Sequence, residues 1–132
     1  MDFDAPESWL YNAVESAGVS AFPVTPPEGR AAPFVVFSRD ATDRDLDLEE
    51  GSTGAAAGDF TVEVFCDGYL DGKALATAVR KAVNNFSGVA YGATIDRVQL
   101  TDERDGPPVL LNGRSTPTYV IEQTYQIFWN ET

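Results

Sequence analysis

Alternating acidic side chains near residue 45 have the type and spacing best suited to binding a cation. Carboxylate oxygens bind calcium, and an EF-hand loop also requires glycine at its sixth position and glutamate at its twelfth. Counted from Asp43, those positions hold Leu48 and Gly54, so the EF-hand template fails. The alternative is a solvated hairpin arm with Leu46 and Leu48 on its other face. The candidate acidic residues are Asp43, Asp45, Asp47, Glu49 and Glu50.

The sequence lacks the residue types on which most other site chemistry depends. It contains no histidine, which excludes a histidine-based triad or relay and the commonest zinc and iron sites. A single cysteine, Cys66, leaves no intrachain disulfide and no cysteine-based metal cluster. P-loop, GxSxG and glycine-rich dinucleotide motifs are absent. We therefore expect no catalytic residues, no cofactor and no metal site.

Length and charge bound the remaining possibilities. The chain has 132 residues, which predicts one domain spanning 1–132, and its 21 acidic against 9 basic residues give a net charge of −12. A protein with this excess of negative charge is unsuited to binding nucleic-acid phosphates. The excess charge either keeps the protein soluble through self-repulsion or lines a passage in which nucleic acid slides without adhering. The N-terminus lacks signal-peptide features and no apolar run is long enough to span a bilayer, so we expect a cytoplasmic start.

The stretch from Asp59 to Phe86 predicts a strand followed by a helix that packs on it. From Phe60 to Cys66 alternate residues are apolar, the period of a strand with one buried face. Cys66 falls on that face and is expected to be a buried small hydrophobe. Asp71 is placed to cap the helix, and Gly88 to end it. The apolar stripe of the helix consists of Leu75, Val79, Ala82, Val83 and Phe86.

Four further segments complete the predicted fold. Residues 5–17 predict a first helix, and 34–37 predict a central strand that is apolar on both faces. Residues 93–101 predict a strand whose change of phase indicates a bulge, and 118–129 predict a last, aromatic strand. The resulting order α-β-β-α-β-β predicts an α+β fold: a four-stranded, mainly antiparallel sheet with two helices packed on one face and long hairpin loops.

The two predicted hairpin loops exceed the usual length, and loops of that length tend to be functional or disordered. In the loop at about 40–59, the small residues between Gly51 and Gly58 are expected to form a mobile tip. The loop at about 102–117 carries three apolar residues in its middle: Val109, Leu110 and Leu111. Apolar residues at such a place either fold back onto the body or contact a partner.

Four stretches in fixed order resemble one known family. They are PFVVFSR (33–39), the strand and helix at 59–88, VQLTDERD (98–105) and TYQIFW (124–129). Taken together, these stretches resemble the tail-completion or tail-terminator family, minor tail proteins of long-tailed bacteriophages. The resemblance covers roughly residues 8 to 129. The chain departs from the family in its acidic, Gly/Ala-rich loop at 40–59 and its proline-rich loop at 105–117.

The resemblance implies a structural virion protein of the neck, assembled in the host cytoplasm. Members of this family form a six-fold ring that caps the tail tube, ends its polymerisation and offers a docking surface to the head. The implied partners are further copies of the chain, the tail tube protein, the head-closure or connector protein and the tape-measure protein. DNA would pass through the lumen without specific binding. Two alternatives are a head-closure or adaptor protein of the connector, and a small acidic non-virion binding protein.

Overall fold

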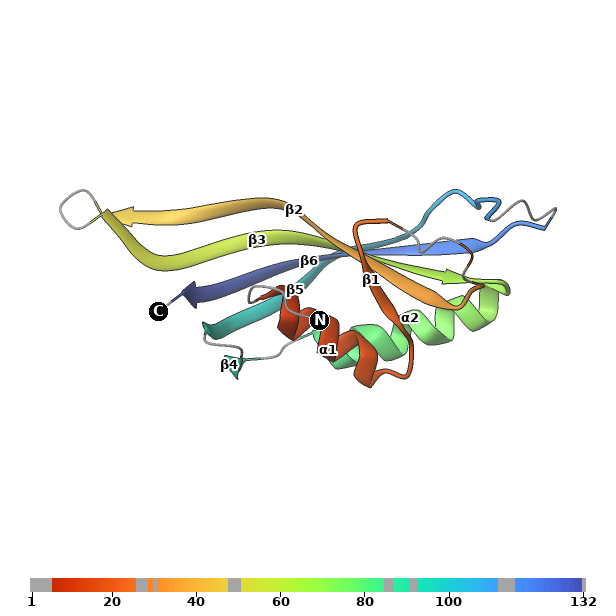
Figure 1. Cartoon of the computed structure of the whole chain (residues 1–132), viewed down its shortest axis with the longest axis horizontal. Helices are drawn as coiled ribbons and strands as arrows, with labels where there is room; N and C mark the ends of the chain where they lie inside the picture. Colours follow the sequence, from red (N-terminus) through yellow and green to blue (C-terminus); the bar gives the residue numbers. More distant parts are fainter. Residues whose placement is uncertain are drawn as a thin grey trace.

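The computed structural model describes residues 6–25, 29, 31–47, 51–84, 87–90, 93–111 and 116–131. Within them the strands form a six-stranded mixed sheet in the order β1-β2-β3-β6-β5-β4, and both helices lie on the same side of it (Figure 1). The helices are α1 (Glu7–Ser16) and α2 (Tyr69–Val83). The strands are β1 (Ala21–Pro23), β2 (Phe34–Asp47), β3 (Gly51–Cys66), β4 (Gly88–Ala90), β5 (Ala93–Asp105) and β6 (Tyr119–Glu131).

The predicted four-stranded, mainly antiparallel sheet in the order α-β-β-α-β-β is wrong. A short strand is added at each edge: β1 pairs parallel to β2 from Ala21 with Val35 to Pro23 with Phe37, and β4 pairs antiparallel to β5. Strand β1 was not predicted from the sequence, because its residues lie in a proline-bearing segment typical of a surface connection. Since proline cannot donate to a ladder, Pro23 is compatible with an edge strand only.

The predicted loop at 40–59 is also mostly strand. β2 continues to Asp47 and β3 begins at Gly51, with two register shifts between the paired strands. The small residues expected at the tip lie within β3, where Ala55 to Gly58 pair with Asn130 to Ile127 of β6. Figure 1 shows this hairpin extending well beyond the helices at one end of the molecule. We refer to residues 41–47 and 51–59 as the arm.

Both helices form where their apolar stripes indicate, but their ends differ from the prediction. Gly18 adopts a φ of 93° just after α1, the left-handed conformation that ends helices. α2 begins at Tyr69, so Asp71 lies in its first turn and makes no capping hydrogen bond. The Asp71 carboxylate is instead stabilised by the partial positive charge at the start of the helix. α2 ends at Val83, and Gly88 belongs to β4 rather than to the helix end.

The main core lies between the helices and one sheet face. It includes Trp9 and Leu10 of α1, Val79 of α2, and the inward residues of β3 and β6. The polar side chain of Gln123 is fully buried there. Gln123 donates a 2.8 Å hydrogen bond to the Ala76 carbonyl and accepts one of 2.7 Å from the Tyr125 hydroxyl. A buried amide with its bonds satisfied fixes α2 on the sheet at one register.

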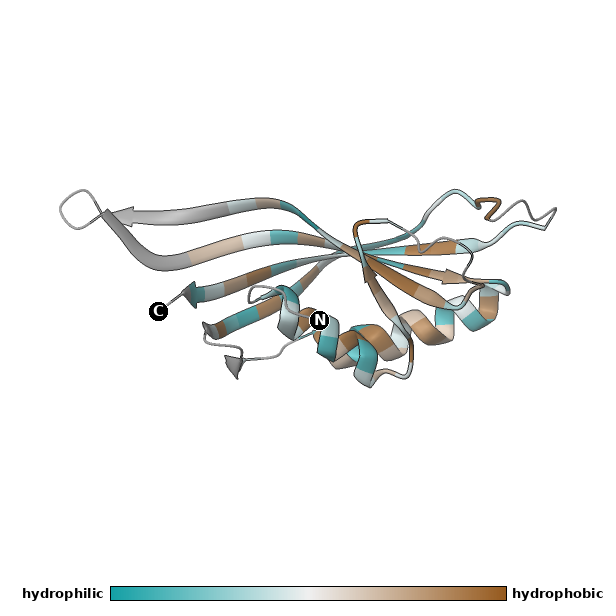
Figure 2. Cartoon of the chain, in the orientation of Figure 1, coloured by the Kyte–Doolittle hydropathy of each residue, from teal (hydrophilic) through white to brown (hydrophobic). Residues whose placement is uncertain are grey.

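A second cluster covers part of the opposite face. Phe34 and Phe65 stack there with ring centroids 4.8 Å apart, beside Val36 and Val120. This explains the predicted strand with two apolar faces, because Val35 and Phe37 face the main core while Phe34 and Val36 face the second cluster. Figure 2 shows hydrophobic residues along the body strands and α2, and hydrophilic ones on the outer faces of the helices.

Candidate interaction surfaces

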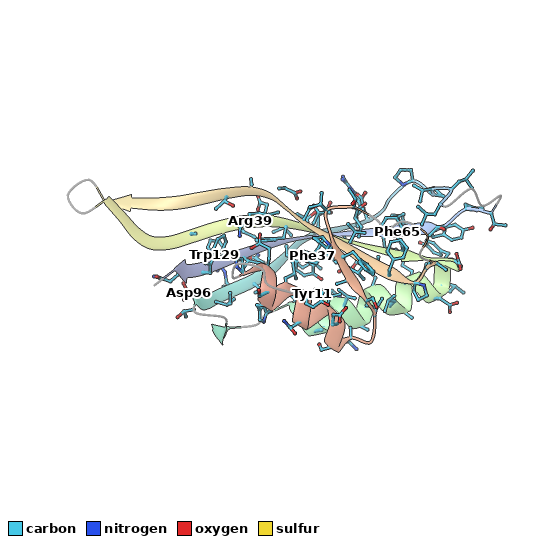
Figure 3. The ribbon with its side chains drawn as sticks, viewed as in Figure 1. Tyr11, Phe37, Arg39, Phe65, Asp96 and Trp129 are labelled. Carbon is cyan, nitrogen blue, oxygen red and sulfur yellow. The ribbon has the colours of Figure 1, made fainter. Side chains whose placement is uncertain are left out.

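The root of the arm is fixed to the body by one arginine. The Arg39 guanidinium of β2 donates a 2.8 Å hydrogen bond from Nε to Glu7 of α1 and makes a second bond to the same carboxylate. It also lies over the Phe60 and Trp129 rings, 5.4 and 5.1 Å from their centroids (Figure 3). This is a bidentate, half-buried ion pair with two cation–π contacts. No local sequence pattern indicates this contact, because its partners are far apart in the chain.

The predicted acidic candidates fall on the arm. Asp43 and Asp47 are paired residues of β2, opposite Ala57 and Gly51 of β3, and Asp45 lies between them at a register shift. Glu49 and Glu50 lie outside the described residues. Among the residues that the structure describes, no group of three or more His, Cys, Asp or Glu is placed to hold a metal ion.

The apolar residues of the second predicted loop separate into two roles. Val109 and Leu111 pack against the second cluster, and Val109 exchanges two backbone hydrogen bonds with Thr118. Leu110, between them, has 64% of its surface exposed. Residues 109–111 therefore pack back onto the sheet, with the Leu110 side chain facing outward.

The middle of the face without helices is acidic. Glu63 of β3 lies opposite Glu122 of β6, and the Asp40 carboxylate accepts a hydrogen bond from Thr61 nearby. Partial burial, together with the Glu122 and Asp40 charges, raises the pKa of the Glu63 carboxyl above its ordinary value. Arg104 offsets part of this charge through a 2.8 Å hydrogen bond to Glu122. The surface is polar and repels anions.

Asp105, the last residue of β5, pairs with α2. Asp105 accepts hydrogen bonds of 2.6 Å from Lys73 and 2.7 Å from the Tyr69 hydroxyl, both on α2. These bonds hold the pKa of the Asp105 carboxyl below its ordinary value. Asp105 thus connects the end of β5 to the first turn of α2.

Comparisons with known proteins identify a shared fold. The chain is similar to a chain from the structure described as the virion of native gene transfer agent (GTA) particle, with a TM-score of 0.59 and 20% sequence identity. The similarity covers 96% of this chain and 86% of that chain. No protein-family model and no curated protein matches the sequence. At this identity the comparison defines an α+β fold found in a virion particle, and nothing finer.

No helix among the described residues has the length and apolar content needed to cross a membrane.

Proposed function

We propose that this chain is a structural virion protein, and specifically a tail terminator: a ring subunit that caps the tail tube and provides the docking surface for the head. The observation that carries the proposal is the likeness, over 96% of this chain, to a chain from a gene transfer agent virion. The order of the tail-completion motifs in the sequence supports the finer assignment. The proposed role is non-enzymatic, with its place at the tail–neck junction.

The shape of the molecule supports a ring subunit. A cyclic ring requires two different surfaces on each subunit that meet head to tail. Here the arm extends at one end of the sheet, and the segment 106–111, which Val109 bridges to Thr118, lies at the other (Figure 1). We propose that these two features contact ring neighbours in a hexamer and, above and below the ring, the tail tube, head-closure and tape-measure proteins. Val109 and Leu111 would hold that segment in shape, and Leu110 would make the contact.

The acidic character of the chain supports a lumen through which DNA passes without adhering. We propose that Asp43, Asp45 and Asp47 of the arm, together with Glu49 and Glu50, contribute to this repulsion. Replacing all five by their amides should slow DNA ejection and weaken its dependence on ionic strength, because the carboxylate–phosphate repulsion that salt screens is lost. Normal packaging and ejection by such particles would remove this part of the proposal.

The deciding experiment is negative-stain microscopy of particles made without this gene. A terminator predicts overlong tubes without heads, because nothing ends tube polymerisation. Tails of normal length beside heads that leak DNA would instead assign the chain to head closure or to an adaptor of the connector. Normal infectious particles would place it outside the neck and favour a small acidic non-virion binding protein.

A further inference from the structure

The two helices leave one part of their sheet face open. α1 has 10 residues and α2 has 15, so α2 continues past α1 toward the start of β2 (Figure 1). A pocket of about 450 Å³ lies there, between α2 and the strand ends. Its lining residues are Pro33, Cys66, Asp67, Gly68, Asp71 and Leu75. The volume is in the range of small-ligand sites, and it accommodates one or two large side chains.

The pocket combines an apolar wall with an acidic rim. Pro33, Leu75 and the buried Cys66 supply the apolar part, and the exposed Asp67 and Asp71 supply two carboxylates. Burial raises the pKa of the Cys66 thiol, and the charges of Asp71 and Asp67 raise it further. The negative potential of the rim therefore reaches the wall of the pocket.

An exposed apolar side chain adjoins this rim. Leu70 precedes Asp71 in the first turn of α2 and has 79% of its surface exposed, the largest exposed fraction among the exposed large hydrophobics of the described residues. Apolar surface next to a rimmed apolar pocket is typical of a protein-binding site.

We propose that this pocket binds a segment of another protein in which an apolar side chain is flanked by lysine or arginine. The apolar side chain would enter between Pro33 and Leu75, and the basic groups would pair with Asp67 and Asp71. A second copy of the chain is disfavoured as the occupant, because each copy carries a net charge of −12 and the rim is itself acidic. The inference does not depend on the proposed function, since it concerns the isolated chain.

The test uses the full-length, ¹⁵N-labelled chain and three short acetylated, amidated peptides. The first probe is Gly-Arg-Phe-Lys-Gly. The second, Gly-Glu-Phe-Asp-Gly, reverses the charges, and the third, Gly-Arg-Gly-Lys-Gly, lacks the apolar side chain. We expect the first to bind with a Kd of about 0.1–1 mM, as suits a three-residue contact, and each control at least about tenfold more weakly. Saturable chemical-shift changes should be confined to Asp67, Gly68, Asp71 and Leu75.

Two sets of variants test separately the contribution of the rim charges and that of the shape of the pocket. The double variant Asp67→Asn/Asp71→Asn should raise the Kd of the first peptide about five- to tenfold. The control, Asp96→Asn/Asp102→Asn, makes the same change of charge on β5 and should leave this Kd within about twofold of its original value. Leu75→Trp keeps both rim charges and should abolish binding by filling the pocket. Equal binding of the first two peptides, or shifts spread over the surface without saturation, would overturn the proposal. Chemical shifts of the same residues that change when the protein is diluted would also overturn the proposal, because they would show that a second copy of the chain occupies the pocket.

Discussion

The guanidinium of Arg39 lies over the indole ring of Trp129, 5.1 Å from its centroid, and joins the arm to the last strand of the sheet. The same guanidinium is held by Glu7 of α1. One side chain thus connects three elements: the first helix, the root of the arm and the C-terminal strand. The contact lies at the root of the arm, which is the part of the fold that projects farthest from the helices.

Arg39→Gln should lower the free energy of unfolding by about 1–3 kcal/mol, since it removes a half-buried bidentate ion pair and two cation–π contacts. The measurement is urea denaturation at pH 7. Arg97→Gln is the matched control: Arg97 also lies over an aromatic ring, 4.5 Å from the Phe128 centroid, but is exposed and should cost less than about 1 kcal/mol. Equal losses in the two variants would contradict a fixing role for Arg39.

The buried Tyr125 hydroxyl predicts a loss of stability in alkali. Burial raises the pKa of Tyr125 above its ordinary value of 10.0, with a further contribution from Glu103. Above about pH 10 the unfolded chain releases this proton while the folded chain retains it. The unfolded state then binds fewer protons, so stability falls as pH rises, by up to about 1.4 kcal/mol per pH unit.

Tyr125→Phe tests this dependence. The variant loses the hydrogen bond to Gln123 at every pH, which costs about 1 kcal/mol, but its stability should fall less steeply above pH 10. Urea denaturation between pH 8 and 11 measures both slopes. If the free energy of unfolding falls with pH equally steeply in the two proteins, Tyr125 titrates alike in the folded and unfolded states and the prediction is wrong.

Gly72→Ala should destabilise α2 despite the higher helix propensity of alanine. A Cβ there would lie 2.8 Å from Cδ1 of Ile121 and 3.3 Å from Cβ of Cys66. We expect a net loss of about 1–3 kcal/mol from overpacking. Combining the change with Ile121→Val removes the clashing methyl, so the double variant should lose less than the sum of the two singles. Exposed Ala74→Gly on the same helix should cost about 0.5–1 kcal/mol through propensity alone.

The arm can be shortened without disturbing the body. Arg44 and Ala56 are register partners, so replacing residues 45–55 by Asn-Gly closes the hairpin with a two-residue turn. Only the pairing of Ala55 with Asn130 is lost from β6. If the proposed function is right, this chain should fold, as judged by circular dichroism, yet fail to restore joined particles to a phage lacking the gene.

The control for the shortened arm keeps its length but changes Asp45 and Asp47 to asparagine, and should still restore particles. Full restoration by the shortened chain would show that the arm makes no required contact. Deleting only 52–58 is a poorer design, because Ala55 to Gly58 pair with β6 and their removal disturbs the body.

The local part of this fold was predictable from sequence and the non-local part was not. Alternation from Phe60 to Cys66 defines a buried face because strand periodicity depends only on neighbouring residues, and the phase change in β5 correctly indicated its register shift. The parallel pairing of β1 depends on a segment more than ten residues away, and its prolines indicated a loop. The contact of Arg39 with Glu7 spans 32 positions, and the pocket brings Pro33 together with residues 66–75.

The register shifts in β2 have a consequence for behaviour at high concentration. β1 covers only Val35 to Phe37 of the outer edge of β2, and beyond that point the ladder is interrupted between Arg39 and Ala41 and again between Arg44 and Leu46. A long, regular edge is a template on which further chains add strands and grow fibres. An edge strand that is interrupted by two register shifts and is rich in aspartate resists such growth. The same irregularity that shapes the arm therefore disfavours edge-to-edge association of the folded protein.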